Sequence, residues 1–186
     1  MTTDEKIIEL FFARSEQGIR ELDAKYGKLC RRLSYNIVGD LQDAEECVSD
    51  AYLGVWNAIP PARPDPLSAY ICKIVRNVSL KLYRKQRAAK RDSACDIALS
   101  ELEECLPSPS TAEDEVDARE RARMIEGFLE TMTEENRVIF MLRYAYFEPG
   151  AAIAEKVGLT EKNVSVRLSR IRRKLKQYLH ERGIPV

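Results

Sequence analysis

Apolar residues recur at spacings of three and four along most of the chain, which is the period of an amphipathic α-helix. Over the first 90 residues this pattern predicts helices at residues 4–17, at 18–38, from Leu41 or Asp43 to about Ile59, and from a Ser68 cap onward. Gly39-Asp40 breaks the second run, and the proline-rich residues 60–66 are expected to form a stiff loop. Alternating, strand-like runs are few. The sequence therefore predicts an all-α fold.

The C-terminal part has the same period. It predicts helices at residues 116–131 and Glu134–Ala145, a third that starts near Pro149, and a last one after Gly158. Thr133 and Thr160 stand at the cap positions of two of these helices. The order of short helix, glycine turn and long helix is that of a helix-turn-helix.

The last predicted helix separates an apolar stripe from a basic face. Its inward residues are spaced by four, three and four: Val164, Leu168, Ile171 and Leu175. No acidic residue occurs between Lys162 and Lys176. Basic groups beside small polar side chains suit phosphate contact and the reading of base edges, with Arg170 and Arg173 on phosphates or guanine and Val166 on a thymine methyl. The expected DNA contacts are Lys162, Asn163, Ser165, Val166, Arg167, Ser169, Arg170 and Arg173.

The net charge of zero conceals three blocks of different sign. Residues 1–90 carry a balance of +3, residues 91–120 of −8 and residues 121–186 of +5. The middle block contains the Pro- and Ser-rich run 106–111, followed by acidic residues, and it is typical of a solvated, flexible linker. We therefore expect two small helical domains, at residues 1–91 and 116–186, joined by an acidic linker at 92–115. The acidic tract suits a solubilising tether and a basic channel in a partner equally well.

A second basic region lies in the fourth predicted helix. From Tyr70 to Arg91 there are eight basic residues and no acidic one, with aromatic residues interleaved. Basic groups follow a phosphate backbone and aromatic rings stack on unpaired bases, so this bias favours nucleic acid over a merely solvated face. For Trp56 alone, which closes the preceding helix, packing in the core is the better interpretation.

The third predicted helix has the opposite charge. Asp40, Asp43, Glu45, Glu46 and Asp50 cluster in it without a basic residue among them. Acids are favoured at the start of a helix, but five within eleven residues exceed that preference. An acidic patch beside DNA-binding faces would repel DNA, so we expect it to meet a basic protein surface.

Other classes of protein fit the sequence poorly. No run of about 18 apolar residues could span a membrane, and the start of the chain lacks the features of a signal peptide, so a cytoplasmic protein is expected. The five cysteines are widely spaced and are interpreted as reduced packing thiols, with a redox sensor as the alternative. With one histidine, no metal-ligand spacing and no Gly-rich phosphate loop, we expect no enzyme, no metal and no cofactor.

Three stretches in this order resemble the bacterial sigma factors of RNA polymerase, specifically the short extracytoplasmic-function (ECF) type. Residues Asp43–Trp56 resemble the helix of region 2 that binds core polymerase, and Leu67–Asn77 resemble the promoter-melting helix. Residues Glu135–Tyr144, with Ile153–Thr160 and the last helix, resemble region 4. The sequence departs from the family at the turn Pro149–Ala152, where an acidic pair is usual, and at Lys81, where an Asp is frequent.

The resemblance implies a role for each surface. Asp43, Glu46 and Asp50 would bind core polymerase at the clamp helices of its β′ subunit, and the surface around Phe140 and Leu142 would face the β flap. The last helix would enter the major groove at the −35 element. The loop Asn57–Pro66 would hold a flipped base of the −10 element. Contacts to the melted −10 strand are expected from Trp56, Asn57, Arg63, Tyr70, Lys73, Arg76, Asn77, Lys81, Tyr83 and Arg84.

The sequence leaves three alternatives open. A sigma factor that directs core polymerase to promoters explains all three surfaces. A stand-alone helix-turn-helix regulator would instead bind a palindrome as a dimer and would leave the acidic helix without a role. A sigma-like protein that has lost promoter activity would act only as a partner-binding module. An anti-sigma factor as a further partner also stays open, and it would cover the same faces.

Overall fold

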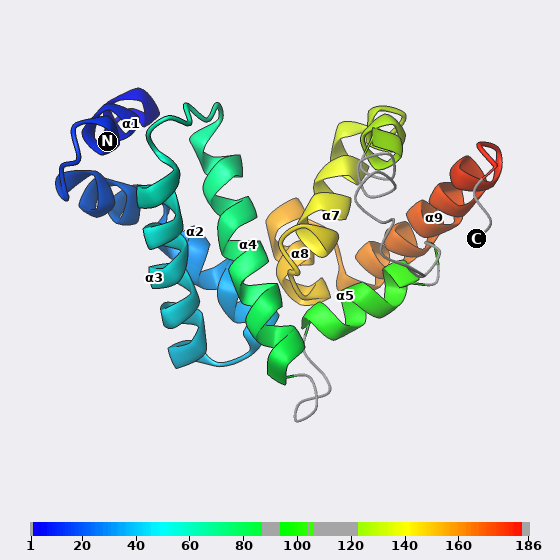
Figure 1. Ribbon diagram of the computed structural model, residues 1–186. Helices are drawn as coiled ribbons and strands as arrows, with labels where there is room; N and C mark the ends of the chain where they lie inside the picture. The colour runs from blue at the N-terminus through cyan, green and yellow to red at the C-terminus, as the bar shows by residue number, and fades with distance from the viewer. Residues whose placement is uncertain (1, 87–93, 104, 106–122, 184–186) are drawn as a thin grey trace. The chain divides into compact units, whose positions relative to one another are not determined.

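The computed structural model describes residues 2–86, 94–103, 105 and 123–183, and it divides into two compact units, Met1–Ser93 (unit 1) and Ala94–Val186 (unit 2) (Figure 1). All regular elements in these described ranges are helices, so the predicted all-α fold is confirmed. None of the described helices combines the length and the apolar character that a membrane span requires. The predicted linker run 106–115, residues 116–122 of the next predicted helix, and the basic residues Arg87, Lys90 and Arg91 lie outside the described residues.

Unit 1 is a helical bundle. Its elements are α1 (Asp4–Phe12), α2 (Gln17–Val38), α3 (Leu41–Ala58) and α4 (Leu67–Gln86). Helices α2, α3 and α4 pack on one another in all three pairings, and α1 packs on α2. The interior is built from the inward stripes of the four helices, including Ile7, Phe11, Leu22, Ile37, Val55, Ile71 and Val75, which are fully buried.

Local chemistry fixes the ends of these helices. Gly39 ends α2 with a φ of +74°, a left-handed conformation that glycine adopts without a steric cost. The Asp40 carboxylate then accepts hydrogen bonds from the backbone N–H groups of Gln42 and Asp43 and so caps α3. The predicted Ser68 cap is wrong, because α4 already begins at Leu67.

Unit 2 contains the helix-turn-helix. Its labelled elements are α5 (Ala94–Glu103), α7 (Glu134–Tyr144), α8 (Gly150–Val157) and α9 (Glu161–His180), and residues 123–130 are also helical. Helix α9 packs on α7 and α8, which also contact each other, and α5 packs on α7. Gly158 ends α8 with a φ of +67°, and the Thr160 hydroxyl accepts a hydrogen bond from the Asn163 backbone N–H at 3.2 Å. The predicted turn and cap are therefore confirmed.

Two features of unit 2 differ from the sequence prediction. Pro149 stands at the N-cap of α8 rather than at its first helical position. Residues 94–103, which the sequence assigns to the linker, form helix α5 instead. The side chains that this segment buries are small: Cys95, Ala98 and the nearby Cys105. The hydrophobic pattern that would indicate a helix is therefore weak.

Candidate nucleic-acid interfaces

Helix α9 has the two faces that the sequence predicts. Val164, Leu168, Ile171 and Leu175 are buried against the rest of unit 2. The opposite side, which we call the reading face, consists of exposed residues: Lys162, Asn163, Ser165, Val166, Ser169, Arg170 and Arg173. Val166 is 41% exposed in the middle of this face, although nothing in the packing of the helix requires an apolar residue there. The structure therefore brings most of the predicted base and phosphate contacts onto one surface.

Two arginines of α9 are held by the protein on the flanks of the helix. Arg167, a predicted DNA contact, is half-buried and forms an ion pair with Glu135 of α7 at 2.6 Å. Arg172, which the sequence does not single out, is half-buried and donates a hydrogen bond to the Tyr144 hydroxyl at 3.1 Å. At about 100° per residue these two arginines lie about 140° apart around the axis, on either side of the buried stripe. They hold α9 against α7 from both sides.

Helix α4 presents a basic stripe in unit 1. Lys73, Asn77, Lys81 and Arg84 are exposed, and their spacings of four, four and three place them along one side of the helix. We call these four residues the α4 stripe. Its charge has no acidic neighbour on α4, since the helix contains none. A row of three cations that extends over about three helical turns suits a phosphate backbone.

Tyr83 is a correction to the prediction. It was expected to stack on unpaired bases, but it is only 6% exposed. Its spacing from Val75 and Ser79 places it on the inward side of α4, so its ring packs in the bundle and cannot present a face to a base. Tyr70 and Arg76 are half-buried, which leaves part of each side chain accessible.

Trp56 and Arg63 are both held by α1 and the turn that follows it. The Trp56 ring makes an edge contact with Phe11 at 6.1 Å between centroids, and Arg14 lies over the ring at 5.6 Å. Arg63, in the proline-rich loop, forms an ion pair with Glu9 at 2.6 Å and stacks over the Phe12 ring at 4.1 Å. The half-buried Trp56 agrees with a packing role, while Asn57 next to it is exposed.

The acidic face of α3 is exposed and carries an apolar residue that the sequence did not single out. Glu46 and Asp50 are exposed, whereas Asp43 is half-buried and accepts a hydrogen bond from Gln86 at 3.2 Å. Leu53 lies one turn beyond them on the same side of the helix and is 59% exposed. The one sequence cue was that Leu53 falls outside the inward stripe of α3.

The predicted apolar surface on α7 is displaced. Phe140 is 5% exposed, because its ring packs against Phe128 and Tyr144, so its expected exposure is wrong. The exposed apolar residues of α7 are Val138 and Met141. Leu142 is half-buried.

The cysteines and acidic residues form no site with metal chemistry in the part of the chain that the structure describes. All five cysteines are buried as free thiols. Burial raises the pKa of Cys30 to about 12, so its thiol stays protonated at neutral pH. A protonated, inaccessible thiol is a poor nucleophile, which agrees with packing rather than redox sensing.

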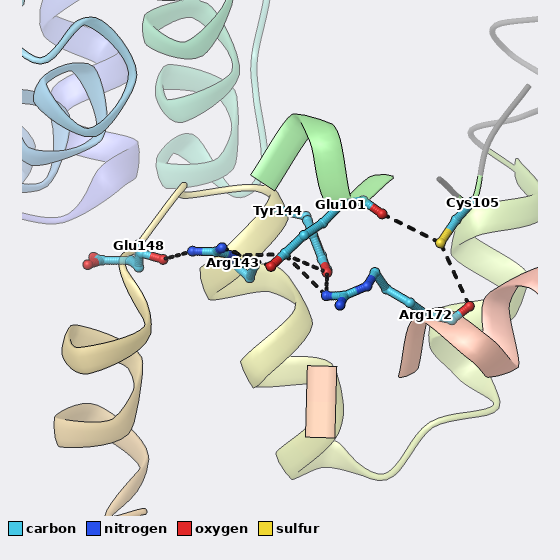
Figure 2. A network of polar contacts seen from close by, with 6 residues as sticks. All are labelled: Glu101, Cys105, Arg143, Tyr144, Glu148 and Arg172. Atoms are coloured by element: carbon cyan, nitrogen blue, oxygen red, sulfur yellow. Dashed lines mark hydrogen bonds and ion pairs between the residues drawn. The ribbon is translucent and has the colours of Figure 1, made fainter. Parts of the chain in front are cut away.

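A network of polar contacts surrounds Glu101 of α5 (Figure 2). Its carboxylate accepts two hydrogen bonds from the Arg143 guanidinium, each at 3.0 Å, and one from the Tyr144 hydroxyl at 3.1 Å. Arg172 of α9 lies 3.3 Å from the same carboxylate. The network continues through Arg143, which donates to the Glu148 carbonyl at 3.3 Å. It thus joins α5, α7, the connection to α8, and α9.

Comparison with known protein families finds one match in each of the two units. The family model for Sigma-70 region 2 matches residues 22–89, and the model for Sigma-70, region 4, matches residues 122–175, which together are more than half of the chain. The chain is similar to the probable RNA polymerase sigma factor RfaY of Xanthomonas campestris pv. campestris, with 26% identity over 148 residues. It is also similar to the ECF RNA polymerase sigma factor SigE of Mycolicibacterium smegmatis, with 24% identity over 165 residues.

The two alignments cover most of this chain but a smaller share of each relative. The two alignments take in 78% and 86% of this chain but only 36% of RfaY and 60% of SigE, so the chain spans less than two thirds of either relative. A solved structure of CnrH in complex with the cytosolic domain of CnrY resembles the chain at 19% identity, with a TM-score of 0.43 over 94% of this chain and 96% of the other.

Proposed function

Because the chain belongs to the sigma-70 family of RNA polymerase sigma factors, and within it to the ECF type, we propose that it directs core RNA polymerase to specific promoters and helps to melt the −10 element. One observation carries the proposal. A single chain holds two basic surfaces on separate units, the reading face and the α4 stripe, and also an exposed acidic face on α3. A stand-alone helix-turn-helix regulator has no use for the second and third surfaces, and is the weaker explanation.

The reading face of α9 is the proposed −35 reader. An α-helix fits the major groove, and the N-terminal half of a recognition helix meets the base edges. Lys162, Ser165 and Val166 lie in that half, and the exposed Val166 suits a thymine methyl. Arg170 and Arg173 lie further along the same exposed side, where they would reach phosphates or a guanine. Arg167 contributes less than the sequence predicts, because Glu135 already holds it.

The α4 stripe is the proposed path of the melted −10 strand. Its three cations would follow the backbone, and the half-buried Trp56 and Tyr70 would offer the accessible part of their rings for stacking. Taking a base out of the stack costs a few kcal/mol, about 2–4, which stacking and phosphate contacts must offset. Asn57 and Arg63 of the connecting loop would hold the flipped base. Arg63 pairs with Glu9 and lies over Phe12, but unlike Arg167 its side chain stays 58% exposed.

The exposed acids of α3 are the proposed docking surface for core polymerase. Glu46 and Asp50 offer charge to a basic helix surface such as the β′ clamp helices, and Leu53 adds an apolar contact at the same place. Asp43 would act mainly within the unit, since it is half-buried and bonded to Gln86. On unit 2, Val138 and Met141 replace Phe140 as the apolar residues that would face the β flap. An anti-sigma factor would inhibit the protein by covering these same surfaces.

Run-off transcription tests the proposal. Purified core polymerase is incubated with a promoter library, with and without the protein, and transcripts are mapped. Specific start sites that depend on the protein, with shared sequence at both elements, would establish a promoter-directing sigma factor. No transcription, combined with retained binding to duplex DNA, would overturn the proposal in favour of the stand-alone regulator.

Two charge-removing variants sharpen the same assay. Asp50→Asn on the exposed face of α3 should lower both transcription and affinity for core polymerase, while duplex DNA binding by the reading face stays intact. Glu5→Gln is the matched control, because Glu5 is an exposed acid at the start of α1 in the same unit. Equal losses in the two variants would argue against α3 as the docking surface.

A further inference from the structure

Helix α5 lies outside both matched family segments, yet it belongs to the DNA-reading unit. The matches end at residue 89 and resume at residue 122, and α5 occupies Ala94–Glu103 between them. Cys95 and Ala98 are fully buried, and α5 contacts α7. Its charged residues are acidic: Asp96, Glu101 and Glu103. The segment therefore supplies unit 2 with a helix of opposite charge to the reading face.

Glu101 is the residue through which α5 contacts both α7 and α9. Its two oxygens accept the Arg143 guanidinium as a fork, with Nε and Nη2 each at 3.0 Å, the geometry in which an Arg–carboxylate pair is strongest (Figure 2). Arg143 is buried, with only 8% of its side chain exposed. The carboxylate also lies 3.3 Å from Arg172 of α9 and accepts from Tyr144 at 3.1 Å. One side chain thus links α7 to the reading helix.

The position of Arg172 on α9 lets its contact with Glu101 influence DNA recognition. Arg172 directly follows the buried Ile171 and directly precedes Arg173 of the reading face. Because successive residues are about 100° apart around a helix, holding the Arg172 head group on one flank restrains the rotation of α9 about its own axis, in addition to the packing of its buried stripe. The Arg167–Glu135 ion pair, more exposed at 31% and 52% of the two side chains, restrains the opposite flank less firmly.

We propose that Glu101 is a positioning residue for promoter recognition: from α5 it sets the rotation of α9 through Arg172, and so decides which side chains of the reading face meet the −35 element. The proposal rests on the proposed function, in which α9 reads DNA. Without the Glu101 charge, Arg143 and Arg172 face each other around Tyr144 with no carboxylate between them, and their repulsion turns α9 away from its position.

The test compares Glu101→Gln with Glu103→Gln in the full-length protein bound to core polymerase. Both variants remove one negative charge from α5 with little change in shape, but Glu103 is exposed. The readout is the ratio of affinities for a selected promoter and for the same promoter with its −35 element scrambled. We expect Glu101→Gln to lower this ratio on the order of tenfold and Glu103→Gln to leave it unchanged.

Further measurements separate positioning from simple loss of folding. All ratios are measured at a temperature at which circular dichroism shows the variant to be fully helical, and affinity for promoter DNA that carries only the −10 element should stay unchanged. Glu101→Asp, which keeps the charge on a shorter side chain, should recover part of the ratio. A folded Glu101→Gln variant with an unchanged ratio would overturn the proposal. If the unaltered protein shows no −35 discrimination, the proposed function itself has failed.

Discussion

Arg143 allows the energy of the unit 2 network to be measured directly. In Arg143→Met the side chain keeps most of its apolar stem but loses two hydrogen bonds to Glu101 and one to the Glu148 carbonyl. Removing one partner of a buried ion pair costs about 3–5 kcal/mol. Glu101 keeps Arg172 and Tyr144 and is 21% exposed, so the lower end applies, and we expect unit 2 to lose about 3 kcal/mol of stability.

Hydrogen exchange by mass spectrometry is the suitable assay, because the chain has two units and a single unfolding midpoint would mix them. A loss of about 3 kcal/mol speeds exchange of the most protected amides in α7 and α9 on the order of a hundredfold. Amides of α2 in unit 1 serve as an internal control and should not change. Fluorescence of Trp56, the single tryptophan, reports on unit 1 independently.

Arg167→Met is the matched control in the same unit. The Arg167–Glu135 pair is considerably more exposed, so its loss should cost about 0–1 kcal/mol and speed exchange by about fivefold at most. A similar small effect for both variants would refute the view that Glu101 and Arg143 form a buried, bidentate pair. A large effect of Arg143→Met on α2 would instead show that the two units unfold together.

Three further outcomes follow from the geometry. Arg173→Ala should weaken promoter binding and reduce the salt slope by about 1, measured by titration at several salt concentrations, whereas Arg182→Ala, in the turn that follows α9, should not. Gly158→Ala should destabilise unit 2 by about 1 kcal/mol, because alanine is strained at a φ of +67°, and unchanged exchange in α8 and α9 would count against this turn geometry. Burial raises the pKa of the Cys30 thiol from 9.0 to about 12. The contribution of the buried, protonated thiol to the stability of unit 1 is therefore complete below pH 9 and is lost as the pH rises toward 12. Alkylation of the native thiol at pH 8 should therefore be far slower than in denaturant, and rapid labelling would contradict the buried placement.

The parts of the fold that follow from local chemistry were predictable. The stripe of α9 needs only the helical period, and the turn before it needs only that Gly158 tolerates a left-handed backbone and that Thr160 can cap. The reading face follows from the same period, since the residues opposite a buried stripe are exposed. That is why most of its predicted members lie together on one surface.

The errors arise where side chains compete or where distant residues meet. Leu82 and Tyr83 are adjacent apolar residues. Tyr83 is the more deeply buried because it shares the inward side of α4 with Val75 and Ser79, and the polar Ser79 hides this stripe from the hydrophobic pattern. Phe140 is likewise buried by Phe128 and Tyr144, which no pattern within α7 reveals. Helix α5 escaped prediction because its anchor joins Glu101 to Arg143, 42 residues apart in sequence. Pairings of that kind are set by tertiary structure.

The packing of α5 on unit 2 also limits the length of chain that connects the two units. With α5 held on unit 2, the chain has only the eight steps from Gln86 to Ala94 in which to cross, at most about 29 Å when fully extended. If α5 were free, the crossing would extend from Gln86 to Arg123 and could reach about 130 Å. The contacts of Glu101 therefore limit how far apart the two units can lie. Under the proposed function, they also limit the separation of the two DNA elements that one molecule could hold.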